Sequence, residues 1–341
     1  MSDVGTWMVD NLYQQLMVDE QWALRRDRGF TWWGYRLAQH VEVAPPVHDR
    51  GLDLCVLRIW TDVVRDVAPN SNPAAILAQL NNQTTLSALV WDPETGTIAD
   101  CCTVTVHQDN ANWMGKILAT AAALQNTAAH SRAHPLARAC GGRPAETQHP
   151  SSGARPEMDD ILNVATEVIV PMGREPSRFA GGLCSAIEPF LVEHSSQRHW
   201  FGTVDQTGAT VEVPFTGSRP LMFQDPKVSD TRLETALVRV FTETPHPEAG
   251  NGALVITQLP LSPGADLAVT LSNDLNRAEF AGGLTTAPLL GAWSPDIFSN
   301  DGNGLAYCSF IPNLLAKPMI LNNWLLYQST RALWARDFLG I

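Results

Sequence analysis

Two histidines in this chain stand four residues apart, a spacing at which two imidazoles on one helix face can bind the same metal ion. They are His130 and His134, in the run His130-Ser131-Arg132-Ala133-His134. The glutamate of an HExxH motif is missing, and the Arg132 guanidinium disfavours a cation nearby. No third ligand is identifiable. We therefore expect a solvated helix end here, with no metal and no other cofactor.

A pair of adjacent cysteines is the second arrangement that could do chemistry. A thiolate at Cys101 or Cys102, assisted by His107, would be a nucleophile for covalent catalysis. Adjacent strand residues face opposite sides of a sheet, however, and buried strand cysteines are usually inert. The chain has no CxxC spacing, so we expect reduced, mostly buried thiols. The six cysteines are Cys55, Cys101, Cys102, Cys140, Cys184 and Cys308.

Carboxylates gather around two predicted hairpins, where paired acids could perform acid–base catalysis or bind calcium. They are Asp92, Glu94, Asp100 and Asp109 in the first half and Asp296 and Asp301 in the second. The second group lacks DxDxDG spacing, and turns favour Asp for its local hydrogen bonds. The chain also lacks GxGxxG, GxxxxGK[ST] and GxSxG motifs. We therefore predict a protein that is not an enzyme.

Composition narrows the classes of function further. The 341 residues carry a formal net charge of −12, and 45% of them are hydrophobic. This acidic balance argues against nucleic-acid binding, which needs a basic surface. The chain contains no run of about twenty apolar residues, so we expect no membrane span. The first residues also lack the pattern of a secretory signal. We expect a cytoplasmic protein with packed cores.

Apolar periodicity and turn chemistry predict alternating helices and strands. The first half is expected to contain a helix over 4–26, strands over 30–47 and 52–64, a short helix opened by Pro73, a hairpin over 85–107 and a long helix to Arg138. The second half is expected to contain a helix over 179–192, strands over 200–215, 236–244 and 253–259, a helix over 266–276, a hairpin over 289–310 and a last helix opened by Pro318. The element order of each half predicts an α+β layer, that is, an antiparallel sheet with helices on one face.

The predicted boundary between the halves is rich in Gly, Pro and Ser over residues 141–156. Such a composition is typical of an exposed, flexible linker. We therefore predict a first domain at 1–138, a linker at 139–157 and a second domain at 158–341.

Five short matches in the same order indicate that one unit occurs twice. They pair 57–62 with 238–243, 41–43 with 211–213, 80–81 with 275–276, 88–91 with 289–293 and 125–129 with 328–332. Each match is weak, and only their common order predicts a duplication.

The order of these elements resembles the YbjN-like and type III secretion chaperone-like fold. The resemblance is carried by the hairpin-plus-long-helix modules at 85–138 and 289–338, and by the apolar strand Leu305–Pro312 that precedes the last helix. It implies two tandem α-β-β-β-α-β-β-α domains of bacterial type. It also implies that such domains pair and hold an extended segment of another protein, here called the client. The stretch 216–235 departs from this pattern.

Adjacent aromatic residues mark a candidate partner surface. Neighbours in a strand face opposite sides, so one member of Trp32-Trp33 and one of Trp200-Phe201 must lie away from the helices. If the sister domain covers that side, they are interface core; if it is open, they form an apolar recognition surface. The candidate partner-binding residues, with two repeated arginine–aromatic pairs added, are Trp32, Trp33, Arg58, Trp60, Trp200, Phe201, Arg239 and Phe241. The arginines either pair with a client carboxylate or stabilise a strand face.

These patterns predict a chaperone-like or adaptor-like protein that holds a client by strand edges and aromatic pockets. A permanent subunit of a larger complex is one alternative. An enzyme of unrecognised family, with a site near His107 and Cys102, is another. The repeat is compatible with a homodimer and with an intramolecular pseudo-dimer.

Overall fold

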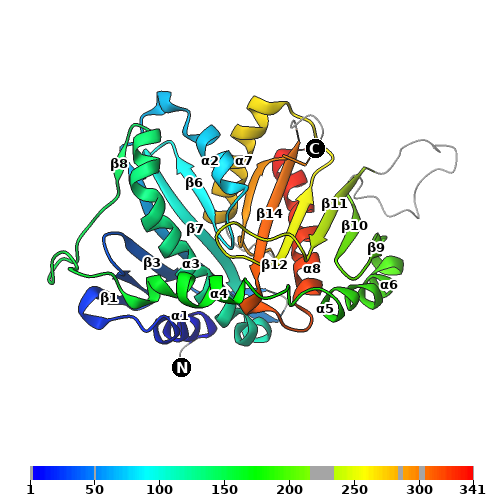
Figure 1. The fold of residues 1–341 in the computed structure, drawn as a ribbon, viewed down its shortest axis with the longest axis horizontal. Coiled ribbons are helices and arrows are strands. Elements are labelled where there is room, and N and C mark those ends of the chain that lie inside the picture. The colour runs from blue at the N-terminus through cyan, green and yellow to red at the C-terminus, as the bar shows by residue number, and fades with distance from the viewer. Residues whose placement is uncertain (1–2, 50, 216–233, 283–286, 299–303, 341) are drawn as a thin grey trace.

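The computed structural model describes residues 3–49, 51–215, 234–282, 287–298 and 304–340 (Figure 1). Its helices are α1 (Val4–Gln15), α2 (Pro73–Asn81), α3 (Gln108–Ala139), α4 (Val170–Met172), α5 (Gly182–Ser185), α6 (Ile187–Arg198), α7 (Ala265–Ala281) and α8 (Ile320–Leu339). The strands before α3 are β1 (Ala23–Arg26), β2 (Gly29–Trp33), β3 (Ala38–Val43), β4 (Val47–Asp49), β5 (Leu52–Arg65), β6 (Ala88–Asp92) and β7 (Thr97–Val106). The strands after it are β8 (Arg143–Pro144), β9 (Phe201–Val204), β10 (Gly208–Pro214), β11 (Thr235–Phe241), β12 (Gly252–Gln258), β13 (Ala292–Pro295) and β14 (Leu305–Pro312).

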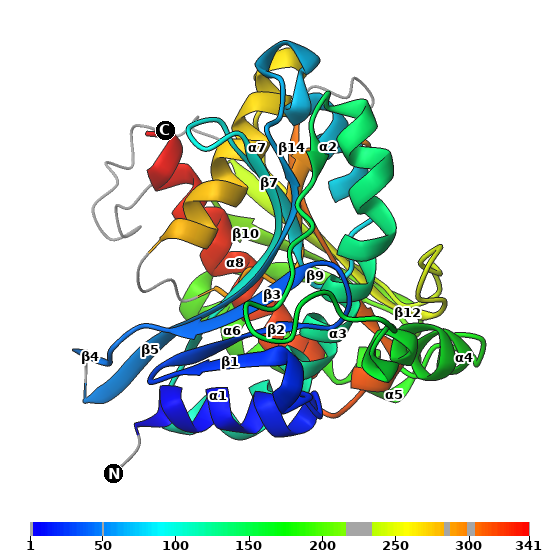
Figure 2. The ribbon, with the colours of Figure 1, turned by 90° about the vertical axis from the view of Figure 1, so that its left-hand side faces the viewer.

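The first sheet has the order β1-β2-β3-β5-β7-β6, and every neighbouring pair is antiparallel. Short strands β4 and β8 pair with β5 outside this path. Helices α1 and α3 pack on one face of the sheet, because alternate residues of its strands are apolar and point toward them (Figure 2). We call this the inner face, and the opposite one the outer face.

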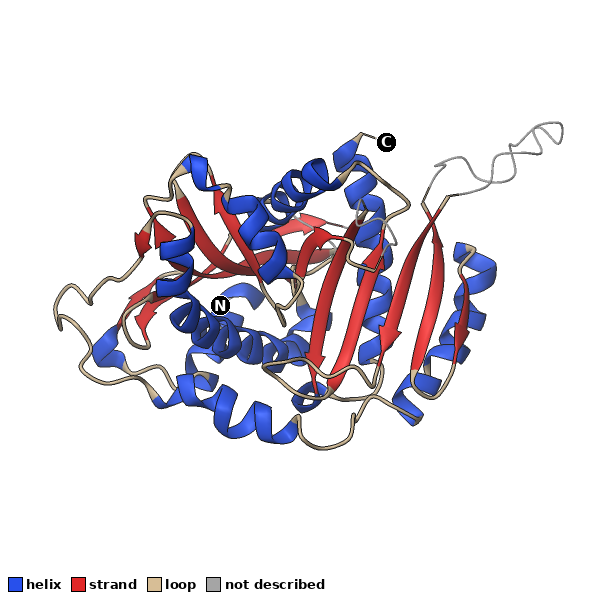
Figure 3. Ribbon diagram, turned by 45° about the horizontal axis from the view of Figure 1, so that its top comes forward, coloured by secondary structure: helices blue, strands red, loops and turns tan. Residues whose placement is uncertain are grey.

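The second sheet has the order β9-β10-β11-β12-β14-β13 and is also antiparallel throughout. Helices α6 and α8 pack on its inner face. In Figure 3 the strands of this sheet stand in front of those helices, so the view is onto its outer face. Each half thus has a meander of four strands, then a helix, a hairpin and a final long helix. The predicted α+β class with antiparallel sheets is confirmed.

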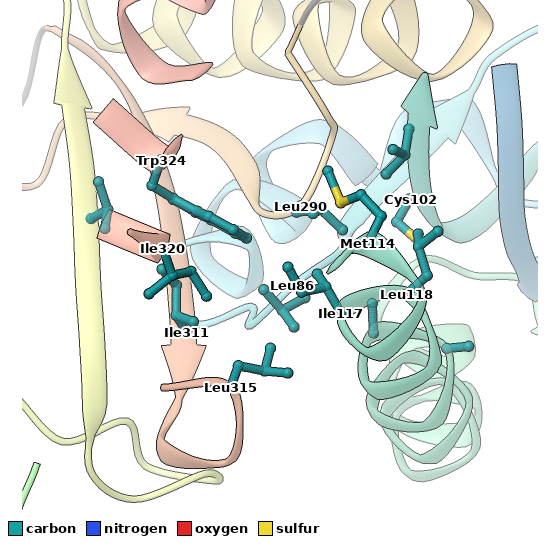
Figure 4. Packing of buried hydrophobic residues seen from close by; sticks show 14 of the residues in the cluster. Leu86, Cys102, Met114, Ile117, Leu118, Leu290, Ile311, Leu315, Ile320 and Trp324 are labelled. Carbon is teal, nitrogen blue, oxygen red and sulfur yellow. The ribbon is translucent and has the colours of Figure 1, made fainter. Parts of the chain in front are cut away.

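The two halves share one packed core. Helices α2 and α7 contact each other between the sheets, near the edge strands β6 and β13. Backbone hydrogen bonds cross the boundary: Leu289 N–H donates to Thr103 O at 2.8 Å, and Phe310 N–H donates to Thr85 O at 3.1 Å. Figure 4 shows Met114 of α3 pointing toward residues of the second half. The halves therefore pack against each other through a shared core.

The segment expected to be a flexible linker is instead folded onto the first sheet. Its residues Arg143–Pro144 pair with β5, and Ala145 and His149 are buried. Trp33 Nε1–H donates to Thr147 Oγ1 at 2.9 Å. A composition rich in Gly, Pro and Ser suits irregular backbone, but this stretch covers aromatic surface that would otherwise meet water.

The first helix is shorter than the sequence predicts. It ends at Gln15, Met17 adopts a left-handed conformation with φ 48°, and Asp19 caps the short turn that follows. Residues Ala23–Arg26 then form β1 rather than helix. Because of this extra strand, the first meander has four strands, where the resemblance implies three. Residues 216–233, where a departure from the family pattern was expected, lie outside the described part of the chain.

Two of the five repeated matches relate strands that hold different positions in the two sheets. The pair 57–62 and 238–243 lies on β5 and β11, the fourth and third strands of their meanders, and 41–43 and 211–213 are displaced by one strand in the same way. Strands under a helix layer alternate apolar and polar residues, so short matches of this kind arise without equivalent positions.

Two other matches share both position and hydrogen bonding. Asn81 of α2 holds the backbone N–H and C=O of Leu89 at 2.9 Å each. Asn276 of α7 holds those of Trp293 at 2.8 and 2.9 Å. On the inner faces, Thr61 and Thr257 each donate a hydroxyl hydrogen bond to a glutamine of the final long helix, Gln125 or Gln328.

Candidate protein-binding surface

The aromatic pairs divide between the two faces, as strand periodicity predicts, but most of their members are buried. Trp32 is fully buried on the inner face, where its Nε1–H donates to Gln39 Oε1 at 2.8 Å. Trp200 packs with Phe190 and His194 of α6 and is 3% exposed. Neither side chain is accessible to a partner. The prediction that they bind one is wrong, because the helix layer needs large apolar side chains beneath it.

Trp33 lies on the outer face of the first sheet and is nevertheless buried. It clusters with Trp22 and Ala38, and His149 of the covering segment packs edge-on against both tryptophan rings. Arg155 lies over the Trp22 ring at 5.8 Å. Trp33 is therefore covered by this same chain and cannot be reached by another protein.

Arg58 and Trp60 also lie on this outer face, and both contact the end of α7. Arg58 donates hydrogen bonds to the last carbonyls of that helix, those of Phe280, Ala281 and Gly282, at 2.9, 3.2 and 2.8 Å. A cation at this place also opposes the negative end of the helix dipole. Trp60 stacks on His40 at 4.8 Å and meets the Phe280 ring edge-on. These residues join the two halves.

Three of the predicted partner-binding residues, Phe201, Arg239 and Phe241, lie on the outer face of the second sheet. Phe201 on β9 is 63% exposed. Arg239 on β11 is half-buried, and its side chain makes no hydrogen bond or ion pair within the described residues. Phe241 is half-buried against a small cluster of Ile256, Ala306 and Cys308. This face is mixed in character, since the exposed Glu212 pairs across the strands with Phe201, and Arg239 makes no ion pair within the described residues.

The strand registers allow the two outer faces to be compared position by position. Across the second sheet, one row joins Gln258, Leu237, Glu212 and Phe201. The equivalent hydroxyl donors Thr61 and Thr257 align β5 with β12, and the matching part of the first sheet pairs Ala38 with Trp33. Trp22 immediately precedes the edge strand β1 and packs with Trp33, whereas Phe201 begins the edge strand β9. Trp22 is 7% exposed, and Phe201 is 63% exposed.

The outermost strands differ in charge as well. Strand β1 carries Arg25 and Arg26, which form ion pairs with Asp10 and with Glu42 at 2.7 Å. Charged side chains on an edge strand discourage pairing with another chain. Strand β9, Phe201–Val204, has no charged residue, and its first three residues are exposed. Its edge is therefore the better template for an added strand.

The histidine pair on α3 is structural. His130 Nε2 accepts hydrogen bonds from the backbone N–H groups of Arg36 and Leu37 at 3.2 and 3.1 Å, so its Nδ1–H donates to Asn126 O at 2.9 Å. Burial lowers the pKa of His130. We expected a solvated helix end here, but the His130 ring is half-buried and both of its nitrogens are hydrogen-bonded. His134 instead pairs with Glu146 at 3.2 Å, and the described residues contain no group of three ligands that could hold a metal.

The alternative of a thiol nucleophile, which the sequence disfavoured, finds no support in the environment of either cysteine. Cys101 packs between the halves and Cys102 in the inner core, and burial raises both thiol pKa values. His107 stands at the start of α3, where its backbone N–H donates to Asn110 Oδ1 at 2.9 Å. Both thiols are therefore protonated at neutral pH, and thiols in that form are poor nucleophiles.

Sequence reasoning missed a buried ion pair in the second half. Arg331 of α8 and Glu279 of α7 approach to 2.9 Å, with side chains only 1% and 3% exposed. Glu279 also accepts from Trp293 Nε1–H at 2.6 Å, and the guanidinium lies over the Tyr307 ring at 3.6 Å. An arginine on the same face as buried Gln328 and Ala335 was the available signal. The contacts indicate a structural role, holding α7 to α8.

Comparison with known proteins places no family name on this architecture. The chain matches no protein-family model, no curated protein and no solved structure. None of the described helices has the length and apolar character needed to cross a bilayer.

Proposed function

We propose that this protein is a non-enzymatic binding protein that holds an extended segment of a client polypeptide on the outer face of its second sheet. The observation that carries the proposal is the contrast between Trp22 and Phe201. Trp22 immediately precedes the edge strand of the first sheet, and Phe201 begins the edge strand of the second. The chain covers Trp22 with its own segment around His149, and leaves Phe201 at the surface.

We further propose that the halves arose by duplication of one YbjN-like or secretion chaperone-like domain and pack as an intramolecular pseudo-dimer. The common strand order supports this, and so do the matching clamps of Asn81 and Asn276. Similar topology alone would not require the same amide to hold the same strand in both halves. Since the first outer face is occupied by α7 and residues 145–155, one chain would hold one client segment.

The client would bind by two kinds of contact. One part of the client would pair its backbone with the uncharged edge of β9 beside Phe201, and the rest would cross the outer face and cover Phe241 with apolar side chains. Burying an exposed phenylalanine is worth roughly 1.5–3 kcal/mol, which is the larger contribution because β9 is short. A client carboxylate would pair with Arg239, which has no partner of its own in the described structure. The preferred client is thus an extended apolar segment with an acidic residue.

Site-specific photo-crosslinking in the native cell tests this proposal. A benzophenone amino acid replaces Phe201 in one variant and Val192 in a matched control. Val192 is similarly exposed, at 69%, but lies on α6. We expect a discrete crosslinked protein from position 201 that is absent from position 192. The adduct should diminish when Arg239→Gln is added.

Two outcomes would contradict the proposal. One is a client that crosslinks equally from both positions, since the surface would then lack the predicted specificity. The other is a stoichiometric partner that copurifies with the protein but never crosslinks at position 201. Thermal unfolding of each variant establishes that the fold is retained.

A further inference from the structure

A cavity of about 320 Å³ lies in the first half, away from the proposed client surface. Its walls come from the β2–β3 loop, from the C-terminal half of α3 and from the segment that follows β8. The inner wall is apolar and contains Leu37 and Leu162, both nearly fully buried, together with the Tyr35 ring. Met158 stands at the mouth and is 45% exposed. This volume is at the lower end of the range for small-molecule sites.

Charged and ionisable side chains around this cavity differ in whether they already have a partner. Arg36 contributes a guanidinium that lies over the Tyr35 ring at 4.8 Å and makes no ion pair with a described carboxylate. The lining carboxylate, that of Glu146, is already engaged by His134 Nε2 at 3.2 Å. His130 has both ring nitrogens committed to backbone groups, so it offers only its ring surface. Thr127 and Ser131 also line the cavity and donate their hydroxyl hydrogens to backbone carbonyls. The lining cation that makes no ion pair with a described carboxylate is Arg36.

We propose that this cavity binds a small carboxylic acid with an apolar body. The apolar body would lie against Leu37, Leu162 and Tyr35, and would cover Met158, whose flexible thioether adapts to different shapes. The carboxylate would pair with the Arg36 guanidinium at the mouth, which favours planar, bidentate contacts. A cationic ligand would meet Arg36 unfavourably, and a purely apolar one would leave the guanidinium without an anion.

Calorimetric titration of the full chain with octanoate tests the proposal, with 1-octanol and octylammonium as uncharged and cationic analogues. We expect octanoate to bind about fivefold or more tightly than octanol, which is the scale of one partly exposed ion pair. Octylammonium should bind most weakly. The substitution Arg36→Gln should reduce octanoate affinity to that of octanol and leave octanol binding unchanged.

Two further variants separate this site from binding elsewhere on the protein. Ser131 lines the cavity from the exposed side of α3, so Ser131→Trp should block all binding and keep the fold. Arg198 also lies over an aromatic ring, that of Trp200, but outside the cavity, so Arg198→Gln should change nothing. Equal affinities for octanoate and octanol, unchanged binding in Arg36→Gln, or no saturable binding of octanoate would each overturn the proposal. None of these results bears on crosslinking at Phe201.

Discussion

Replacing Asp100 by asparagine should stabilise this protein at neutral and alkaline pH. Asp100 lies on β7 beneath α3, and its side chain is fully buried. Burial raises the pKa of its carboxyl group to about 6, although the nearby Arg132 guanidinium lowers it. Hydrogen bonds from Ser87 and from the Cys101 backbone also lower this pKa, and the charge of Glu248 raises it. The folded state therefore prefers the protonated acid, and ionisation opposes folding.

The size and sign of the effect follow from the two pKa values. Below its ordinary value of 3.8, the acid is protonated in the folded and unfolded states and carries no penalty. The penalty grows as the pH rises toward 6 and is then constant. A shift from 3.8 to about 6 corresponds to about 3 kcal/mol of unfolding free energy. Asparagine has the same shape without the charge, so Asp100→Asn should recover up to this amount.

Urea unfolding of wild type and Asp100→Asn from about pH 4 to about pH 8 measures the difference. The gain should be largest at the alkaline end and should vanish near pH 4. Asp92→Asn is the control, because hydrogen bonds from Thr95 lower the pKa of that exposed carboxyl. Its substitution should cost stability at neutral pH instead. A variant at Asp100 that is no more stable at pH 8, or whose gain is independent of pH, would refute the reasoning.

Three further tests concern other buried groups. Burial lowers the pKa of His40 to about 4, so its stabilising effect is complete above about pH 6.5 and is lost as the pH falls; in His40→Gln the acid-side loss of unfolding free energy, measured in urea, should be shallower by up to about 1.4 kcal/mol per pH unit. Asn276→Ala leaves the buried backbone of the β13 tryptophan unpaired and should cost about 2 kcal/mol or more in thermal unfolding, and Asn81→Ala should cost a similar amount. Glu279→Gln leaves a buried guanidinium without its anion and should cost about 3–5 kcal/mol in urea, whereas replacing Glu279 and Arg331 together by leucine and methionine should recover much of that loss.

Local signals predicted most elements of the fold but not all of their ends. Pro73 begins α2, and the turn over 92–96 joins β6 to β7, because proline and turn residues restrict the backbone by themselves. The apolar spacing over 4–26 continues beyond Gln15, yet the chain reverses at Met17. The reversal is stabilised by the pairing of β1 with β2, and helical periodicity carries no signal of that pairing. For the same reason, the composition of residues 141–156 predicted a flexible linker, whereas the structure packs this segment over Trp33.

For the candidate surface, the sequence indicated which residues to examine but not which of them are accessible. It predicted that Trp32 and Trp33 face opposite sides, since this depends only on the pleat of one strand. It could not distinguish Trp22, which is covered, from Phe201, which is not. Nor could it show that Arg239 has no partner among the described residues while Arg58 has three carbonyl acceptors.

The sequence by itself determined the α+β class, the places of most helices and strands, and the sidedness of each strand. These properties depend on residues within a few positions of one another. The tertiary structure alone decided which outer face is covered, because the covering groups are remote in the chain. Thr147 reaches Trp33 across 114 positions, and the end of α7 reaches Arg58 across 222. Burial at such separations depends on how whole layers pack, and no local pattern records it.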